Sequence, residues 1–214
     1  MTQDNKLVPL EKFGLKIMSF GFISGNDTPV IWRGPLVSRM TEQFFRDVEW
    51  GELDILILDL PPGTGDIQLT LTQKLRMTGA VIVTTPQDIA LADVRKGADM
   101  FRKVNTPVLG VVENMSGLNI NGRTDPDNPN LQINGEKVSI DSDGTFSINL
   151  DLFKTGGGKK ESERLGVPLL GKIPISEEIM SSTDLGTPLT ARDSTDGICG
   201  IYTEITDQLL SVIK

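Results

Sequence analysis

The sequence predicts an α/β protein in which a mostly parallel sheet is flanked by helices. Residues 55–58 are apolar at every position, and a strand that is apolar on both faces is typical of a sheet covered by helices on both sides. Comparable strands are predicted at 80–84, 107–113 and 168–173, with amphipathic helices between them. A chain of 214 residues suits one such unit, so we expect a single domain over residues 1–214.

Composition limits the kind of partner that this chain can have. Its net charge is −8, and no run of Lys or Arg forms a basic stripe, which disfavours nucleic-acid binding. The absence of histidine excludes Ser-His-Asp and Cys-His catalysis, and the single cysteine, Cys199, suits a reducing compartment. No apolar segment approaches the roughly 20 residues of a membrane span, and the polar start is no signal peptide. We therefore expect a cytoplasmic protein without nucleic-acid or membrane partners.

The strand at 55–58 leads directly into the first candidate site. Asp59 follows the strand at the carboxyl edge, where open α/β sheets bind ligands, and a carboxylate there can hold Mg²⁺. The following Pro-Pro-Gly-Thr-Gly at 61–65 removes two backbone donors and allows an amide of Gly63 to approach a phosphate closely. The alternative is a core strand followed by a Pro-Gly turn.

Several helices and one further strand are predicted from periodicity and capping. Residues 15–23 alternate and then become apolar, which indicates a strand, and Pro35 suits the first turn of a helix. Residues 67–75 fit a strand or a helix, and Asp66 as N-cap favours the helix. Thr85-Pro86-Gln87-Asp88 provides a cap and an acidic first turn for the next helix, and Ser176 can cap another. The terminal helix carries one apolar face formed by Ile198, Ile201, Ile205, Leu209 and Val212. Cys199 lies beside that face and is interpreted as a packed residue.

Residues 117–155 differ from the rest and are predicted to form an insertion that contains a hairpin. Residues 131–140 read as two short strands around an Asn134-Gly135 turn. Asp141-Ser-Asp-Gly-Thr145 resembles a calcium loop, but its glycine comes too early, so we interpret it as a second turn. The glycines at 156–158 precede two lysines without the spacing or the hydroxyl residue of a P-loop, and indicate a flexible start to a helix.

Several motifs together resemble the Mrp family of ParA/MinD-like P-loop ATPases, which are iron–sulfur cluster carriers. They are Trp32-Arg-Gly-Pro35, Val48-Glu-Trp-Gly51, Asp59-Leu-Pro-Pro-Gly-Thr-Gly-Asp66, Thr78 to Asp93, Val111-Val-Glu-Asn-Met-Ser116, Gly156-Gly-Gly158 and Gly166 to Pro174. The resemblance implies a ParA/MinD-like P-loop NTPase fold, ATP hydrolysis in a nucleotide-sandwich homodimer, and delivery of clusters to iron–sulfur apoproteins. It also implies ATP and Mg²⁺ as cofactors.

The resemblance assigns roles to particular residues. Asp59 would organise Mg²⁺ and the attacking water, and Gly63 would present an amide near the γ-phosphate. Asn114, with Pro174 and Ile175, would hold the adenine, since an amide side chain offers both a donor and an acceptor. Taken without the resemblance, Asn114 can equally be a residue that only shapes a turn.

Two motifs that the resemblance leads one to expect are missing from the sequence. There is no Gly-x-x-x-x-Gly-Lys-Ser/Thr to cradle phosphates, and in the family this motif and its strand lie upstream. We hypothesise a truncated reading frame or a split gene. Cys-x-x-Cys is also absent, because residues 116–121 take its place, so the chain's own residues argue against an iron–sulfur cluster site.

Two other functions are therefore weighed against an ATPase. The first is a non-catalytic, degenerate homologue that serves as an interaction module or as a subunit of a complete family partner. The second is an unrelated Rossmann-like binder, which is disfavoured because no Gly-x-Gly-x-x-Gly follows a strand. Binding and turnover of Mg-ATP by the purified chain separate the first from the ATPase.

Overall fold

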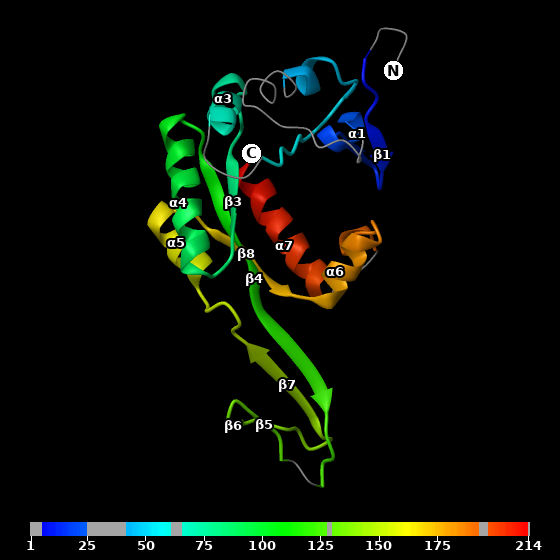
Figure 1. The fold of residues 1–214 in the computed structure, drawn as a ribbon, viewed down its shortest axis with the longest axis vertical. Coiled ribbons are helices and arrows are strands. Elements are labelled where there is room, and N and C mark those ends of the chain that lie inside the picture. Colours follow the sequence, from blue (N-terminus) through cyan, green and yellow to red (C-terminus); the bar gives the residue numbers. More distant parts are fainter. Residues whose placement is uncertain (1–5, 25–41, 61–65, 128–129, 193–196, 214) are drawn as a thin grey trace. The chain divides into compact units, whose positions relative to one another are not determined.

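A computed structural model describes residues 6–24, 42–60, 66–127, 130–192 and 197–213 (Figure 1). The chain falls into two compact units, residues 1–77 and 78–214, and each is described by itself. The prediction of a single domain stays a prediction. None of the helices in these ranges is long and apolar enough to cross a membrane.

The first unit begins with a hairpin of β1 (Leu10–Lys12) and β2 (Leu15–Ile17), which pair antiparallel. The strand predicted over 15–23 is correct only as far as Ile17, because α1 (Phe20–Ser24) follows. The hydroxyl of Ser19 accepts a hydrogen bond from the amide of Gly21 at 3.3 Å, which favours a helical turn. The Phe20 ring stacks on Phe44 at 4.4 Å and holds that turn in place.

The buried strand predicted at residues 55–58 is wrong for this structure. Residues 53–60 form no strand, and the side chains of Ile55 and Ile57 are 53% and 86% exposed. A strand is stable only when its backbone N–H and C=O groups pair with a neighbouring strand. In the described part of the chain no strand pairs with this segment, so its apolar run lacks both ladder partners and cover.

Two helical segments complete the first unit. α3 (Asp66–Lys74) settles the choice between strand and helix at 67–75 in favour of the helix, and Leu71 is buried on it. The helix predicted from Pro35 starts outside the described residues, and its later part is seen as a helical segment at 42–46. Val48 just after it is buried and forms a bridge with Leu7.

The second unit is built on a mixed four-stranded sheet with β4 (Val108–Arg123) at its centre. β3 (Ala80–Thr84) and β8 (Leu169–Ile175) pair parallel with the first half of β4. β7 (Thr145–Leu150) pairs antiparallel with its second half. The three parallel strands confirm the predicted strands at 80–84, 107–113 and 168–173, and the sheet confirms the α/β class.

Helices cover both faces of the parallel part of this sheet (Figure 1). α4 (Asp88–Lys103) and α5 (Gly157–Leu165) lie beside one another, and α4 packs on β3 while α5 packs on β4. α7 (Gly197–Val212) packs on β8 and β4, where Ile205 joins Val112, Leu170 and Ile173 in the core. The predicted docking of the terminal helix is therefore confirmed. The remaining helices are α6 (Glu177–Asp184) and the 3₁₀ helix η1 (Leu189–Ala191).

The predicted cap of α4 is wrong, although the helix itself is confirmed. The helix begins at Asp88, its N-cap is Gln87, and no side chain caps it. The Thr85 hydroxyl is buried and has no hydrogen-bond partner among the described residues. Thr85 lies two residues before the N-cap Gln87, and Pro86 between them is fully buried against the start of α5.

The fully buried side chain of Glu161 links α5 to α4 in an ion-pair network. Its carboxylate accepts hydrogen bonds from Nε of Arg164 at 3.0 Å and from Nη2 at 2.6 Å, and from Nε of Arg95 at 3.3 Å. Arg164 also lies 3.4 Å from the Asp99 carboxylate. Hydrogen bonding to Glu161 raises the pKa of the Arg164 guanidinium above its ordinary value.

The insertion forms a projecting arm on the second unit (Figure 1). Its base is a two-stranded ribbon, defined as residues 118–123 of β4 paired with residues 145–150 of β7. Further out, β5 (Gln132–Ile133) and β6 (Glu136–Lys137) pair around Asn134-Gly135, both with positive φ, which confirms the predicted hairpin. The ribbon itself is a strand pair that the sequence did not predict.

The turn at residues 141–145 connects the arm back to β7, as predicted. The Asp143 carboxylate accepts hydrogen bonds from the Thr145 hydroxyl at 2.7 Å and from its amide at 3.1 Å. These two bonds, the hydroxyl first, lower the pKa of Asp143 below its ordinary value of 3.8. Because the folded pKa is depressed, the turn is fully stabilised above about pH 4 and loses this contribution as the pH falls through the folded pKa.

A Thr145→Val variant is expected to raise the pKa of Asp143 toward 3.8 and to leave it short of that value, because the amide bond remains. An NMR titration of the Asp143 side-chain carbonyl measures this. Ser147→Ala, on the same strand, is the matched control and should leave the titration unchanged. An unchanged pKa of Asp143 in Thr145→Val would show that the hydroxyl bond is not formed in solution.

Candidate functional site

The carboxyl ends of β3, β4 and β8 meet at one edge of the second unit. Thr84 of β3 lies beside Glu113 of β4, and Asn114 of β4 lies beside Ile173 of β8. Because all three strands run parallel, their polar end residues gather at one rim, which is where open α/β sheets bind ligands. This rim is the candidate site.

Glu113 is a fully buried acidic residue at the rim, and it connects the end of β4 to α5. Its carboxylate accepts hydrogen bonds from the Ser116 hydroxyl at 2.6 Å and from the amide of Gly158 at 2.5 Å, at the start of α5. A buried carboxylate that accepts charge-assisted hydrogen bonds at a helix N-terminus is stabilised there. It therefore ties the end of β4 to α5. The sequence analysis did not identify Glu113 as a site residue. The feature that could have indicated it is an acidic residue at the end of an otherwise apolar strand.

Gly157 and Gly158 are required by close packing and Gly156 by its backbone conformation, so these glycines form a packed start to α5 where a flexible one was predicted. Gly156 has φ +76°, a conformation that favours glycine. A Cβ on Gly157 would lie 2.7 Å from the carbonyl oxygen of Pro86, and one on Gly158 would lie 2.7 Å from the Cβ of Glu113. The rejection of a P-loop at this position holds, because the Glu113 carboxylate already occupies the amide of Gly158.

Asn114 lies where β4 leaves the parallel part of the sheet. The pairing with β8 becomes irregular between Asn114 and Leu118, and Met115 and Gly117 both have positive φ. The Asn114 side-chain oxygen accepts a hydrogen bond from the Met115 amide at 2.9 Å, so the residue does shape a turn. Its side-chain nitrogen has no hydrogen-bond partner within the described ranges, which leaves a donor for a ligand.

A cavity of about 620 Å³ opens beside the end of β8, within the size range of small-molecule sites. It is lined by residues from β4, β8, α6 and α7, which are Leu118, Asn119, Pro174, Ile175, Ser176, Glu177, Glu178, Ser181 and Ile198. The Ser176 hydroxyl caps α6 as predicted, accepting from the amides of Glu178 and Ile179. None of the described residues that line the cavity is basic, so it suits an uncharged ring and hydroxyl groups better than a phosphate.

The structure brings only some of the predicted site residues together. Pro174 and Ile175 line the cavity. Asn114 does not line it, but it lies on the adjacent strand β4 opposite Ile173, the residue before Pro174. Asp59 is exposed in the first unit, and Gly63 lies outside the described residues. The roles predicted for Asp59 and Gly63 at Mg²⁺ and the γ-phosphate therefore stay predictions. Among the described residues no group of three acidic, histidine or cysteine side chains is arranged to hold a metal ion.

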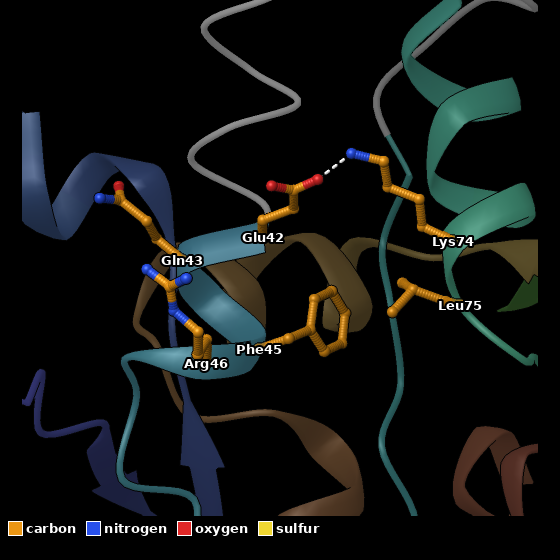
Figure 2. Close-up of a pocket in the computed structure, with 6 residues that line it drawn as sticks. All are labelled: Glu42, Gln43, Phe45, Arg46, Lys74 and Leu75. Carbon is orange, nitrogen blue, oxygen red and sulfur yellow. Dashed lines mark hydrogen bonds and ion pairs between the residues drawn. The ribbon is translucent and has the colours of Figure 1, made fainter.

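A second cavity, of about 580 Å³, lies in the first unit and is a weaker candidate. Figure 2 shows the Glu42 carboxylate and the Lys74 ammonium directed toward one another as an ion pair. Arg46 forms a further ion pair with Asp47 at 3.1 Å. The charges around this cavity therefore neutralise one another, which leaves little to bind a charged ligand.

Cys199 is buried on α7, as predicted, and its thiol donates to the carbonyl of Leu189 at 3.4 Å. A four-thiolate cluster site needs several accessible cysteines, and this sequence contains one. The donor set therefore does not fit an iron–sulfur cluster held by this chain, and no step through a cluster is derived from it.

The sheet, the helices on both its faces and a rim at the carboxyl ends of its parallel strands define an α/β protein of the nucleotide-binding class. Residues 1–144 and 145–210 match a ParA-family model described as a NUBPL iron-transfer P-loop NTPase. The chain belongs to this family, whose relatives include the Mrp-type iron–sulfur cluster carriers, and the resemblance found in the sequence is confirmed.

Relatives and a solved structure show how far the similarity extends. An iron–sulfur cluster carrier protein of Pseudomonas fragi is 44% identical over 92% of this chain and 61% of its own length. The iron–sulfur cluster transfer protein NUBPL of Dictyostelium discoideum is 38% identical over 98% of this chain and 58% of its own length. The structure of a nucleotide-binding protein of Archaeoglobus fulgidus in complex with ADP is 33% identical with a TM-score of 0.60, over 86% of this chain and 63% of that one. The chain thus spans about three fifths of the proteins it resembles.

Proposed function

We propose that this chain holds the base and ribose of an adenine nucleotide in the cavity beside Pro174 and Ile175, as part of an iron–sulfur cluster carrier. The observation that carries the proposal is this cavity, at the carboxyl end of β8 and one strand from Asn114. The ADP complex of the similar Archaeoglobus fulgidus protein and the membership of the family support it.

The residues of the rim fit an adenine nucleoside. Pro174 and Ile175 offer apolar surface to the faces of a base, while the free donor of Asn114 can hydrogen-bond its edge. Glu177 lines the same cavity in the first turn of α6 and can accept hydrogen bonds from ribose hydroxyls. Glu178 is held by Arg192 at 2.8 Å. The acidic lining keeps phosphates outside the cavity.

The remaining parts of an ATPase are proposed to lie elsewhere in the assembly. Asp59 and Gly63 would act at Mg²⁺ and the γ-phosphate, but residues 1–214 contain no Walker A motif to hold that phosphate. We therefore expect that these residues alone bind nucleosides and do not hydrolyse ATP. A complete family partner, with which this chain would form a dimer in place of a homodimer, would provide the phosphate-binding groups and the cluster thiolates, and iron–sulfur apoproteins would receive the cluster.

Binding of adenosine and of Mg-ADP to the purified chain tests this proposal. If only base and ribose are held, the two should bind with equal affinity within about threefold, and guanosine should bind about tenfold more weakly. Asn114→Ala removes one hydrogen bond to the base and should weaken adenosine binding about tenfold. Asn121→Ala, an exposed asparagine on the ribbon, is the matched control and should bind normally. Isothermal titration calorimetry measures all of these.

Three outcomes would contradict the proposal. Mg-ADP binding a hundredfold more tightly than adenosine would mean that residues 1–214 hold phosphates on their own. Turnover of Mg-ATP by the purified chain would overturn the expected loss of hydrolysis. Equal adenosine affinities of Asn114→Ala and the parent chain would remove Asn114 from the site.

The second candidate function is an interaction module without catalysis of its own. One specific observation favours it, namely the projecting arm that occupies the position where cluster-binding cysteines were expected. The two functions are compatible, because the arm shares only Leu118 and Asn119 at its base with the cavity, and β7 does not line the cavity.

A further inference from the structure

The ribbon has two chemically different faces. In an antiparallel pair, residues directly opposite each other point to the same face, and successive pairs alternate between faces. One face carries the apolar pairs Leu118 with Leu150, Ile120 with Ile148, and Gly122 with Phe146. The other carries the polar pairs Asn119 with Asn149, Asn121 with Ser147, and Arg123 with Thr145. The Phe146 ring covers Gly122, where a Cβ would lie 2.3 Å from it, so the apolar face is continuous.

The apolar face is partly exposed, since Leu118, Phe146, Ile148 and Leu150 are half-buried, and beyond Leu118 both outer edges of the ribbon are unpaired among the described residues. The helices gather around the first half of β4 and leave the ribbon clear (Figure 1). Ile120, at the centre of the apolar face, is 37% exposed. Within the described ranges β7 pairs only with β4, and beyond Leu118 β4 pairs only with β7. A two-stranded ribbon is marginally stable by itself, and exposed apolar surface next to a free strand edge is typical of a binding site.

The charge around the ribbon favours a basic partner. Residues 117–155 contain six acidic and three basic side chains, a net charge of −3. Two of the basic side chains are engaged, since Lys154 forms an ion pair with Asp88 and Arg123 donates to the Asp143 carbonyl. At this face the same arm of a second copy, also with a net charge of −3, would be repelled, as would nucleic acid or an anionic membrane.

The size of the face favours a short segment over a folded surface. Six residues of strand pair cover about 20 Å by about 10 Å, or about 200 Å². Standard protein–protein interfaces bury about 800 Å² on each partner, so this face alone is too small for a stable dimer. An extended peptide gains main-chain hydrogen bonds at a strand edge in addition to side-chain contacts, and therefore needs less area.

We propose that the ribbon binds an extended segment of a partner protein, which adds as a third strand along the free edge of β7. The segment has apolar side chains at every second position, in line with the face formed by Leu150, Ile148 and Phe146. Basic residues flank it and meet the acidic surroundings, of which Asp151 directly after β7 is the nearest to the strand end. This inference is independent of nucleotide binding.

A designed peptide tests the proposal on the whole chain without nucleotide. The probe is a nonapeptide with valine at alternate positions, serine between them, and two lysines at each end. Titrated into ¹⁵N-labelled protein, it should give saturable NMR shifts confined to the ribbon. A peptide of the same composition with its valines adjacent should bind at least about tenfold more weakly, as should one flanked by glutamates.

Matched variants distinguish a loss of peptide binding at the apolar face from a loss of the folded structure of the arm. Ile120→Thr should weaken binding of the lysine-flanked peptide about tenfold, whereas Ser147→Thr on the polar face should leave it unchanged. Both variants place a β-branched threonine in the strand, so neither lowers its β-propensity. Asp151→Lys lies outside the ribbon and should narrow or reverse the preference for the lysine-flanked peptide over the glutamate-flanked one.

Three results would overturn the proposal. One is the absence of saturable shifts up to millimolar peptide, and another is equal binding of the alternating and the rearranged peptide. The third is a concentration-dependent dimer in sedimentation analysis that Ile120→Thr abolishes, because a second copy would then cover the face.

Discussion

Replacing Arg164 by methionine is expected to lower the free energy of unfolding of the second unit by about 3 kcal/mol. Glu161 is fully buried, and Arg164 provides its closest hydrogen bonds, at 2.6 and 3.0 Å. The variant leaves a buried carboxylate whose remaining charged partner is Arg95, at 3.3 Å and half exposed. The desolvation of the carboxylate is then poorly compensated, which destabilises the fold. Because Arg95 remains as a partner, we expect a loss of unfolding free energy at the lower end of the range known for broken buried ion pairs. Urea unfolding followed by circular dichroism measures the loss.

The chain offers a matched control for this ion pair. Asp93 and Lys96 have the same i,i+3 spacing on α4, but their side chains are 80% and 67% exposed. Lys96→Met should therefore change the free energy of unfolding by less than about 0.5 kcal/mol. A double variant, Glu161→Leu with Arg164→Met, should recover most of the stability lost in Arg164→Met, because no unpaired charge remains buried. A double variant as unstable as the single one would mean that packing, and not the unpaired charge, causes the loss.

Gly157→Ala is expected to cost about 2–3 kcal/mol of unfolding free energy and to disturb the candidate rim. The added Cβ would lie 2.7 Å from the carbonyl oxygen of Pro86 and 2.9 Å from its Cα. Both are backbone atoms of a fully buried residue, so neither can move away as the end of a flexible side chain can. The strain should therefore separate α5 from the end of β3. Thermal unfolding, together with adenosine binding, measures both effects.

Another helical glycine provides the control for this substitution. Gly97 lies inside α4 with nothing within 4 Å of an added Cβ. Gly97→Ala should therefore raise the free energy of unfolding by about 0.5–1 kcal/mol, which is the normal gain for alanine over glycine in a helix. If Gly157→Ala were as stable as the parent chain, the close approach of α5 to Pro86 would be absent in solution.

Local patterns were sufficient to predict much of the second unit. The buried strands, the amphipathic helices and the Asn134-Gly135 hairpin were predicted from periodicity and turn residues, and the structure confirms them. These features depend on neighbours within a few residues, which a sequence displays directly. The start of α4 was placed wrongly, because the helix begins at Asp88 after Gln87, without the side-chain cap that the sequence led us to expect.

The candidate site was predictable only in part, because its geometry depends on residues far apart in the sequence. Motifs pointed to Asn114, Pro174 and Ile175, and the pairing of β4 with β8 brings them to one edge. Nothing local showed that Glu113 would be buried and bonded to Gly158, 45 positions away. Asp59 and Gly63 remain predictions, because the apolar segment before Asp59 has no strand partner in the described residues.

The sequence by itself determined the α/β class, the family and the lack of a Walker A motif and of paired cysteines, because these follow from residue type and spacing. Only the tertiary structure decided that Gly157 and Gly158 are sites of close packing, that the insertion forms a ribbon with one apolar face, and that residues 55–58 are not a strand. The physical reason is that burial and strand pairing depend on which residues are neighbours in space. An apolar sequence pattern shows that a segment needs such neighbours to form a buried strand, but it does not show that they are present.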